Sequence, residues 1–200
     1  MSALNYVSAN IALFFDGMKL ADSLYGAFRQ DRYQEERETS VISTINRVAI
    51  LALQTGEFLG VVKGASPRFL GGLKTGEFVL RCVAVPIRVK ELGRSFERNK
   101  IEFIERAIIS PVSDVLRVVS EIDIYEESHY LKQYEKKGED ATRPIYETDF
   151  EGHSYIVGYR KVDPEECRKA IESGRSFAEA VAKVGLVSEA AVFSSSLNLA

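Results

Sequence analysis

The chain has 200 residues, enough for one domain or for one domain with a small appendage. Its composition, 46% hydrophobic and 28% charged, is that of a globular protein and excludes disorder over the whole length. A net charge of −3 gives no general reason to expect nucleic acid or an anionic membrane as partner. The two cysteines, Cys82 and Cys167, are too few and too far apart for a disulfide framework or a cysteine zinc site.

The first predicted element is a helix over residues 4–28. Its apolar residues follow one another at steps of three and four, which places them all on one stripe of a helix. The stripe consists of Leu4, Val7, Ile11, Phe14, Met18, Ala21, Tyr25 and Phe28.

Two further helices are predicted over residues 38–63 and 68–92, separated by a Gly- and Pro-containing break at 63–67. The earlier one is apolar over so broad an arc that we expect it to be buried on more than one side. In the later one, residues 79–89 combine a helical stripe with the alternation typical of a strand, and Pro86 lies within them. We predict a helix that is kinked at Pro86, with an edge strand as the alternative.

A fourth long helix is predicted from about Ser95 toward Lys137, with a kink at Pro111. After a loop over 136–142, residues 143–150 and 154–162 are typical of a β-hairpin. Asp163 and Pro164 then open a helix, and a capping box at Ser176 and Glu179 predicts a second short helix that ends near Gly185.

These elements predict a mainly α fold, namely a helical bundle of about four long helices with a small C-terminal β-hairpin plus short helices. We expect the bundle to occupy residues 1–138 and the small α+β appendage residues 139–200. Short turns would connect the bundle helices in an up-and-down order.

One six-residue segment occurs twice, as LQTGEF at 53–58 and as LKTGEF at 73–78. Two copies are too few for a repeat architecture, which needs about three to bury a continuous core. We interpret the pair as chance or as two helices with similar packing, and a partner-facing motif is the less favoured alternative.

We find no catalytic, cofactor or metal motif. Glu126 and His129 have the spacing of one half of a di-iron site, but the second Glu-x-x-His is missing. His153 belongs to the predicted hairpin turn, where polar residues commonly form the turn itself. Cys82 lies in Val-rich sequence and is expected to be a buried small hydrophobic residue. An enzyme is therefore not expected.

Charge is unevenly distributed along the chain. Residues 60–117 contain 11 Lys and Arg against 6 Asp and Glu, whereas residues 118–153 contain 4 against 10. Either the two blocks are solvated, or the basic residues form a partner-facing surface. Its candidate residues are Arg81, Arg88, Lys90, Arg94 and Arg98.

The sequence favours a non-catalytic interaction or scaffold protein with a protein partner, which can be a second copy of the chain. The alternative is a peripheral membrane-associated protein that uses the apolar segments 41–62 and 69–92, flanked by Lys63, Arg68 and Lys74. Residues 178–197 loosely resemble a helix-turn-helix. The second helix has no Arg, Lys, Asn or Gln before Asn198, so nucleic acid is not an expected partner. Without a secretory signal, we expect a cytoplasmic location.

Overall fold

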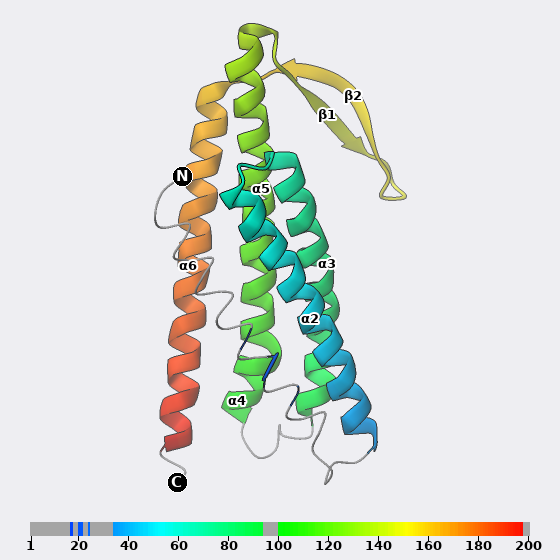
Figure 1. Cartoon of the computed structure of the whole chain (residues 1–200), viewed down its shortest axis with the longest axis vertical. Coiled ribbons are helices and arrows are strands. Elements are labelled where there is room, and N and C mark those ends of the chain that lie inside the picture. Colours follow the sequence, from blue (N-terminus) through cyan, green and yellow to red (C-terminus); the bar gives the residue numbers. More distant parts are fainter. Residues whose placement is uncertain (1–16, 18–19, 22–23, 25–33, 94–99, 198–200) are drawn as a thin grey trace.

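The computed structural model describes residues 17, 20–21, 24, 34–93 and 100–197, and 81% of these residues are helical. The mainly α fold and the small β-hairpin are thus confirmed. The long helices run side by side in an elongated bundle, and the hairpin projects from one end (Figure 1). The predicted helix over 4–28 lies almost entirely outside the described residues. The long helices are α2 (Gln34–Val62), α3 (Pro67–Leu92), α5 (Ser110–Lys137) and α6 (Pro164–Leu197).

α2 and α3 form an antiparallel helical hairpin. Gly64, at φ 70°, allows the chain to leave α2 in the left-handed region. The side chain of Ser66 then caps α3 by accepting a hydrogen bond from the Phe69 N–H at 3.3 Å, and Pro67 follows at the first helical position. α3 remains helical through Pro86 to its end at Leu92, so the strand alternative for residues 79–89 is wrong.

α5 continues a helical segment that begins with α4 (Lys100–Ile104) and passes through a π-helical turn, η2 (Glu105–Ile109). The π turn lies directly before Pro111, the residue where the sequence predicts a kink. Such a turn is a recognised cause of a helix bend. Gly138 ends α5 at φ 60°, and a short 3-10 turn, η3 (Gly138–Asp140), leads to the hairpin.

The hairpin consists of β1 (Thr142–Thr148) and β2 (Ser154–Lys161), paired antiparallel with an irregularity between Ile145 and Tyr146. Asp149 organises its turn, because Oδ1 accepts the N–H groups of Glu151 and His153 at 3.0 and 2.8 Å. The predicted hairpin and its turn are confirmed.

The two short helices expected after Asp163 form one continuous helix of 34 residues, α6. Ser176 lies inside it and begins no new helix. α6 packs closely on α5, since a Cβ placed on Gly174 would lie 3.0 Å from Ile124 Cγ1. This contact holds α6 against the bundle, and α5 lies between α3 and α6 (Figure 1).

The buried residues beside the hairpin differ in kind from those between α2, α3 and α5. Beside the hairpin, an apolar cluster forms from Tyr130, Ala141, Val162 and Cys167. Between α2, α3 and α5, by contrast, many buried positions are polar or charged. The buried polar side chains of the described residues are Ser43, Asn46, Arg47, Gln54, Lys74, Glu77, Arg81, Glu105 and Ser120.

Candidate functional site

A charged network lies where α2, α3 and α5 meet, and Lys74 stands at its centre. The ammonium of Lys74 is 2.7 Å from Glu57 on α2, 2.9 Å from Glu77 on α3 and 2.5 Å from Glu121 on α5. The side chains of Lys74 and Glu77 are 4% and 1% exposed, so their attraction is little screened by water. One ammonium therefore joins carboxylates of all three helices.

The network continues from Glu77 toward the other end of the bundle. Arg81 pairs with Glu77 at 2.7 Å and with Asp114 of α5 at 2.8 Å. Arg117 lies beside the same α5 carboxylates, 3.5 Å from Glu121 and 4.0 Å from Asp114. Alternating charges thus extend along the interior of the bundle.

Two neutral side chains complete the network. Gln54 donates to Glu77 at 2.9 Å, and the hydroxyl of Tyr125 donates to Glu57 at 2.7 Å. Burial and the adjacent Glu57 raise the pKa of the Tyr125 hydroxyl, which keeps that hydroxyl in the form that can donate. Each bond reduces the cost of holding a carboxylate away from water.

The carboxyl groups of the network differ in their proton affinity. Burial raises the pKa of Glu57, because Lys74 compensates only partly and Glu121 adds repulsion. Burial also acts on Glu77, but Lys74 and Arg81 outweigh it and lower its pKa to about 2. Of these two carboxyl groups, Glu57 therefore accepts a proton more readily than Glu77.

The duplicated six-residue segment explains this geometry. The two copies face each other across the antiparallel α2–α3 crossing, so that Gln54 of the first copy binds Glu77 of the second, and Lys74 binds Glu57 in return. The glycines behave alike. A Cβ on Gly56 would lie 3.6 Å from Leu73, and one on Gly76 would lie 3.3 Å from Leu53. The duplication is a self-complementary helix contact with approximate two-fold symmetry.

The exterior of α2 over residues 41–62 and of α3 over residues 69–89 is largely apolar. Every exposed residue from 41 to 62 and from 69 to 89 is uncharged. We expected α2 to be buried on more than one side, and that expectation is wrong, because one apolar side of this helix is exposed. The exposed residues are Val41, Ile42, Ile45, Val48, Ala52, Thr55, Leu59 and Val62 on α2, and Phe69, Gly72, Thr75, Val79, Cys82, Val83, Pro86 and Val89 on α3.

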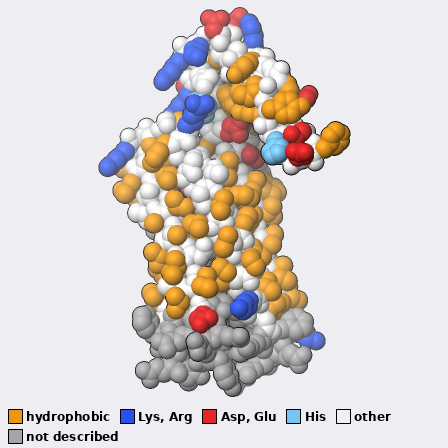
Figure 2. Space-filling model, turned by 90° about the vertical axis from the view of Figure 1, so that its right-hand side faces the viewer, with side chains coloured by type: hydrophobic (Ala, Val, Ile, Leu, Met, Phe, Trp, Pro, Cys, Tyr) orange, Lys and Arg blue, Asp and Glu red, His pale blue; other side chains and the backbone are white. Residues whose placement is uncertain are grey.

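We call these sixteen residues the outer face. Figure 2 shows the molecule from this side, where hydrophobic side chains extend down the bundle below the hairpin. Each helix contributes about 30 Å of length to the face, at a rise of about 1.5 Å per residue. An exposed, largely apolar surface of this extent is uncommon on a monomeric soluble protein.

The β-hairpin projects on the same side of the bundle (Figures 1 and 2). Its exposed side chains include Tyr146, Tyr155, Tyr159 and, at the tip, Phe150. Tyrosine combines an apolar ring with a polar hydroxyl and suits a boundary between apolar and aqueous surroundings. Arg143 fixes the base of the hairpin by pairing with Glu127 at 2.8 Å.

The structure describes three of the five residues of the expected basic face. Arg81 is buried in the network and is not available to a partner. Lys90 is exposed and Arg88 is half-buried, whereas Arg94 and Arg98 lie outside the described residues. Lys74, predicted as a basic flank of an apolar segment, is likewise buried, but Lys63 and Arg68 are exposed at the α2–α3 turn.

The other candidates of the sequence lie apart from the network. His129 Nε2 is 2.7 Å from the Gln133 amide nitrogen, and His153 is exposed in the hairpin turn. In the part of the chain that the structure describes, no group of three or more His, Cys, Asp or Glu residues has metal-binding geometry. Cys82 is exposed on the outer face, so its predicted burial is wrong, while Cys167 is buried.

No protein-family model, curated protein or solved structure matches this chain. The residues themselves must therefore carry any functional argument.

Sequence reasoning missed the network because no motif describes it. The duplicated segment was the available signal, since it repeats the two positions that carry the polar residues, 54 and 57 in one copy and 74 and 77 in the other. Chemically, the network holds buried charges of both signs. With α2, α3 and α5 joined by ion pairs inside, the apolar side chains of α2 and α3 remain outside.

Proposed function

We propose that this chain is a non-catalytic, peripheral membrane-bound scaffold protein whose outer face lies against the lipid. The observation that carries the proposal is that the exposed residues of both segments, 41–62 and 69–89, are uncharged, while all their charged residues are buried or half-buried. In a water-soluble bundle, charged residues lie on the exposed side of a helix and apolar residues face the interior.

Length and composition support the same function. Among the described residues, one helical segment, Val41–Val62, is long and apolar enough to cross a membrane, and 28% of it is buried. A core helix of a soluble protein would be mostly buried. The residues at the two ends of the outer face also suit a lipid surface. Lys63 and Arg68 are exposed at one end and Lys90 at the other.

The arrangement favours a bundle that lies on the membrane. α6, separated from α3 by α5, exposes charged side chains between residues 165 and 183, among them Glu172, Arg175 and Glu179. These charges require water or a polar partner. With α2 and α3 toward the lipid and α6 away from it, both surfaces are satisfied, and the tyrosines of the hairpin suit the interface beside the outer face.

Vesicle flotation with a matched pair of variants tests the proposal. Val79 on the outer face and Val184 on α6 are 55% and 57% exposed, so glutamate at either position leaves the interior intact. We expect the full chain to float with vesicles of mixed neutral and anionic lipid. Val79→Glu should weaken binding about tenfold or more, since burial of one such side chain contributes about 1.5–3 kcal/mol. Val184→Glu should bind like the wild type.

Failure of the wild type to float, or equal binding of the two variants, would overturn the proposal. If Val79→Glu instead dissociates an oligomer in lipid-free solution, the outer face is a protein interface. A fluorophore on Cys82 gives a second readout, because Cys82 is exposed on the face whereas Cys167 is buried. Burial also raises the pKa of the Cys167 thiol to about 12, which keeps it unreactive near neutral pH. Vesicles should shift the emission of the Cys82 label to shorter wavelength.

A further inference from the structure

Six exposed charged residues of α6 alternate in sign along one side of the helix, next to Glu166 and Lys169, which are also exposed. The six follow one another at steps of three or four residues, so that all of them lie along one side of the helix. We call them the α6 stripe: Glu165, Arg168, Glu172, Arg175, Glu179 and Lys183, all exposed.

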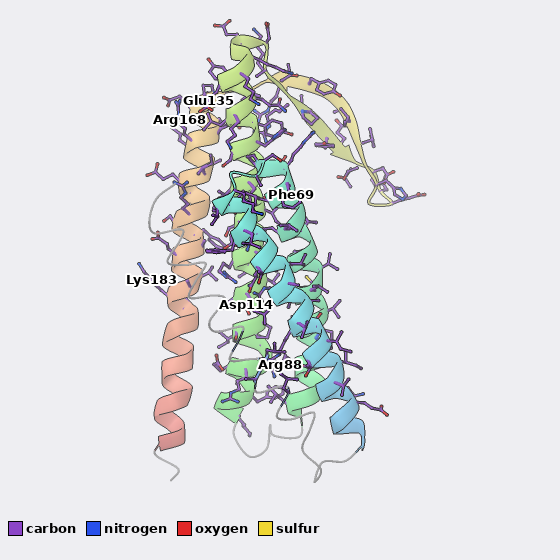
Figure 3. The ribbon with its side chains drawn as sticks, in the orientation of Figure 1. Phe69, Arg88, Asp114, Glu135, Arg168 and Lys183 are labelled. Carbon is purple, nitrogen blue, oxygen red and sulfur yellow. The ribbon has the colours of Figure 1, made fainter. Side chains whose placement is uncertain are left out.

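In the part of the chain that the structure describes, no ion pair or side-chain hydrogen bond involves the side chains of the stripe. Opposite charges at these spacings can pair along a single helix. In the described part of the chain, however, none of the six forms an ion pair with another of them. Arg168 and Lys183 lie on the side of α6 away from α2 and α3 (Figure 3). The stripe thus presents three acidic and three basic groups to its surroundings.

We propose that the α6 stripe is the contact for a second copy of this chain, bound with the two α6 helices antiparallel. Antiparallel pairing about a point between residues 172 and 175 places Glu172 opposite Arg175, Arg168 opposite Glu179 and Glu165 opposite Lys183. The two-fold symmetry forms each pair twice, as is usual for a dimer that uses one surface of both copies. Parallel pairing would place each residue opposite itself and would repel.

Charge complementarity selects this partner over an unrelated protein. A partner of single charge sign would be repelled by half of the stripe, and only an alternating surface of the same spacing matches all six groups. The stripe itself is such a surface. The dimer stands independently of the membrane proposal, because it forms on the opposite side of α5 and needs no lipid.

Sedimentation velocity of the full chain at low and high salt tests the dimer, with charge swaps as variants. We expect a dimer at about 0.05 M salt that weakens at about 0.5 M, because exposed ion pairs are screened. Glu172→Arg alone places two arginine side chains opposite each other, and Arg175→Glu alone places two glutamates. Each should raise the Kd of the dimer about tenfold or more, since like charges across an interface cost several kcal/mol.

The double variant Glu172→Arg with Arg175→Glu restores opposite charges and should restore the dimer. Lys132→Glu, an exposed charge reversal on α5, serves as control and should dimerise like the wild type. Far-UV circular dichroism of each variant verifies that α6 stays helical. A wild type that is monomeric at low salt, or a double variant as weak as the single ones, would show that the stripe is a solvated surface and would overturn the inference. Neither outcome depends on flotation with vesicles.

Discussion

Glu57 and Glu77 occupy the same position in two copies of one short segment, and their carboxylates bind the same ammonium, that of Lys74, at 2.7 and 2.9 Å. Their surroundings nevertheless differ. Glu77 also binds Arg81, whereas Glu57 is repelled by Glu121 and accepts a hydrogen bond from the Tyr125 hydroxyl. The symmetry of the helix contact is therefore broken by Arg81 of α3 and by Glu121 and Tyr125 of α5.

This difference predicts unequal effects of the same substitution. Glu77→Gln leaves Lys74 and Arg81 buried without their shared carboxylate and should lower the free energy of unfolding by about 3–5 kcal/mol. Glu57→Gln resembles the protonated form of Glu57 and keeps an oxygen that accepts from Tyr125. It should cost about 1 kcal/mol or less. Urea unfolding followed by circular dichroism measures both, and equal costs would refute the distinction.

The pH dependence of stability should separate the same two groups. The pKa of Glu57 is raised in the folded state above its ordinary value of 4.5, so the folded chain binds this proton more tightly. Its contribution to stability is present below pH 4.5 and is lost as the pH rises through the folded pKa. Unfolding free energies of wild type and Glu57→Gln, compared between pH 4.5 and 8 or so, should show this decline in the wild type only.

The contribution of Glu77 to stability has the opposite dependence on pH. Its folded pKa of about 2 lies below the ordinary 4.5, so its contribution is present above pH 4.5 and is lost as the pH falls toward 2. Glu77→Gln should therefore lose less stability than the wild type over that acid range. A parallel decline in both proteins would indicate that Glu77 is not held ionised by Lys74 and Arg81.

Substitution by alanine should have opposite effects on stability at two glycines. A Cβ on Gly60 of α2 would lie 2.9 Å from the buried Leu70 of α3, so Gly60→Ala should destabilise the helical hairpin by about 1–3 kcal/mol. Gly72 has no neighbour within 4 Å of such a Cβ, and Gly72→Ala should stabilise α3 by up to about 1 kcal/mol. Thermal unfolding measures the two shifts. Equal shifts would contradict the close α2–α3 approach at Gly60.

The two proposals together predict that the protein links membranes. A dimer formed through the α6 stripe leaves the two outer faces on opposite sides, so the wild type should cluster vesicles. Glu172→Arg should float with vesicles without clustering them, and the double swap with Arg175→Glu should restore clustering. Val79→Glu should neither float with vesicles nor cluster them. Turbidity and dynamic light scattering measure the clustering. If Glu172→Arg clusters vesicles as strongly as the wild type, clustering does not depend on the dimer.

Much of the secondary structure follows from local sequence. The break at Gly64 and Pro67, the Asp149 turn and the Asp163–Pro164 helix start lie where the sequence predicts them, because capping and turn formation need only neighbouring residues. Local reasoning was wrong at Ser176. There the capping box is outweighed by the packing of α6 on α5 around Gly174, a contact between residues distant in the sequence.

The sequence by itself determined that segments 41–62 and 69–89 form helices with an apolar side and a few charged residues. Only the tertiary structure decided which side faces inward. Lys74, Glu77 and Arg81 are spaced to share one side of α3, and burial costs them little only because Glu57, Asp114 and Glu121 neutralise them from two other helices. That compensation depends on groups far apart in the sequence, so helical periodicity alone could not reveal that the apolar side of α2 and α3 is the outer one.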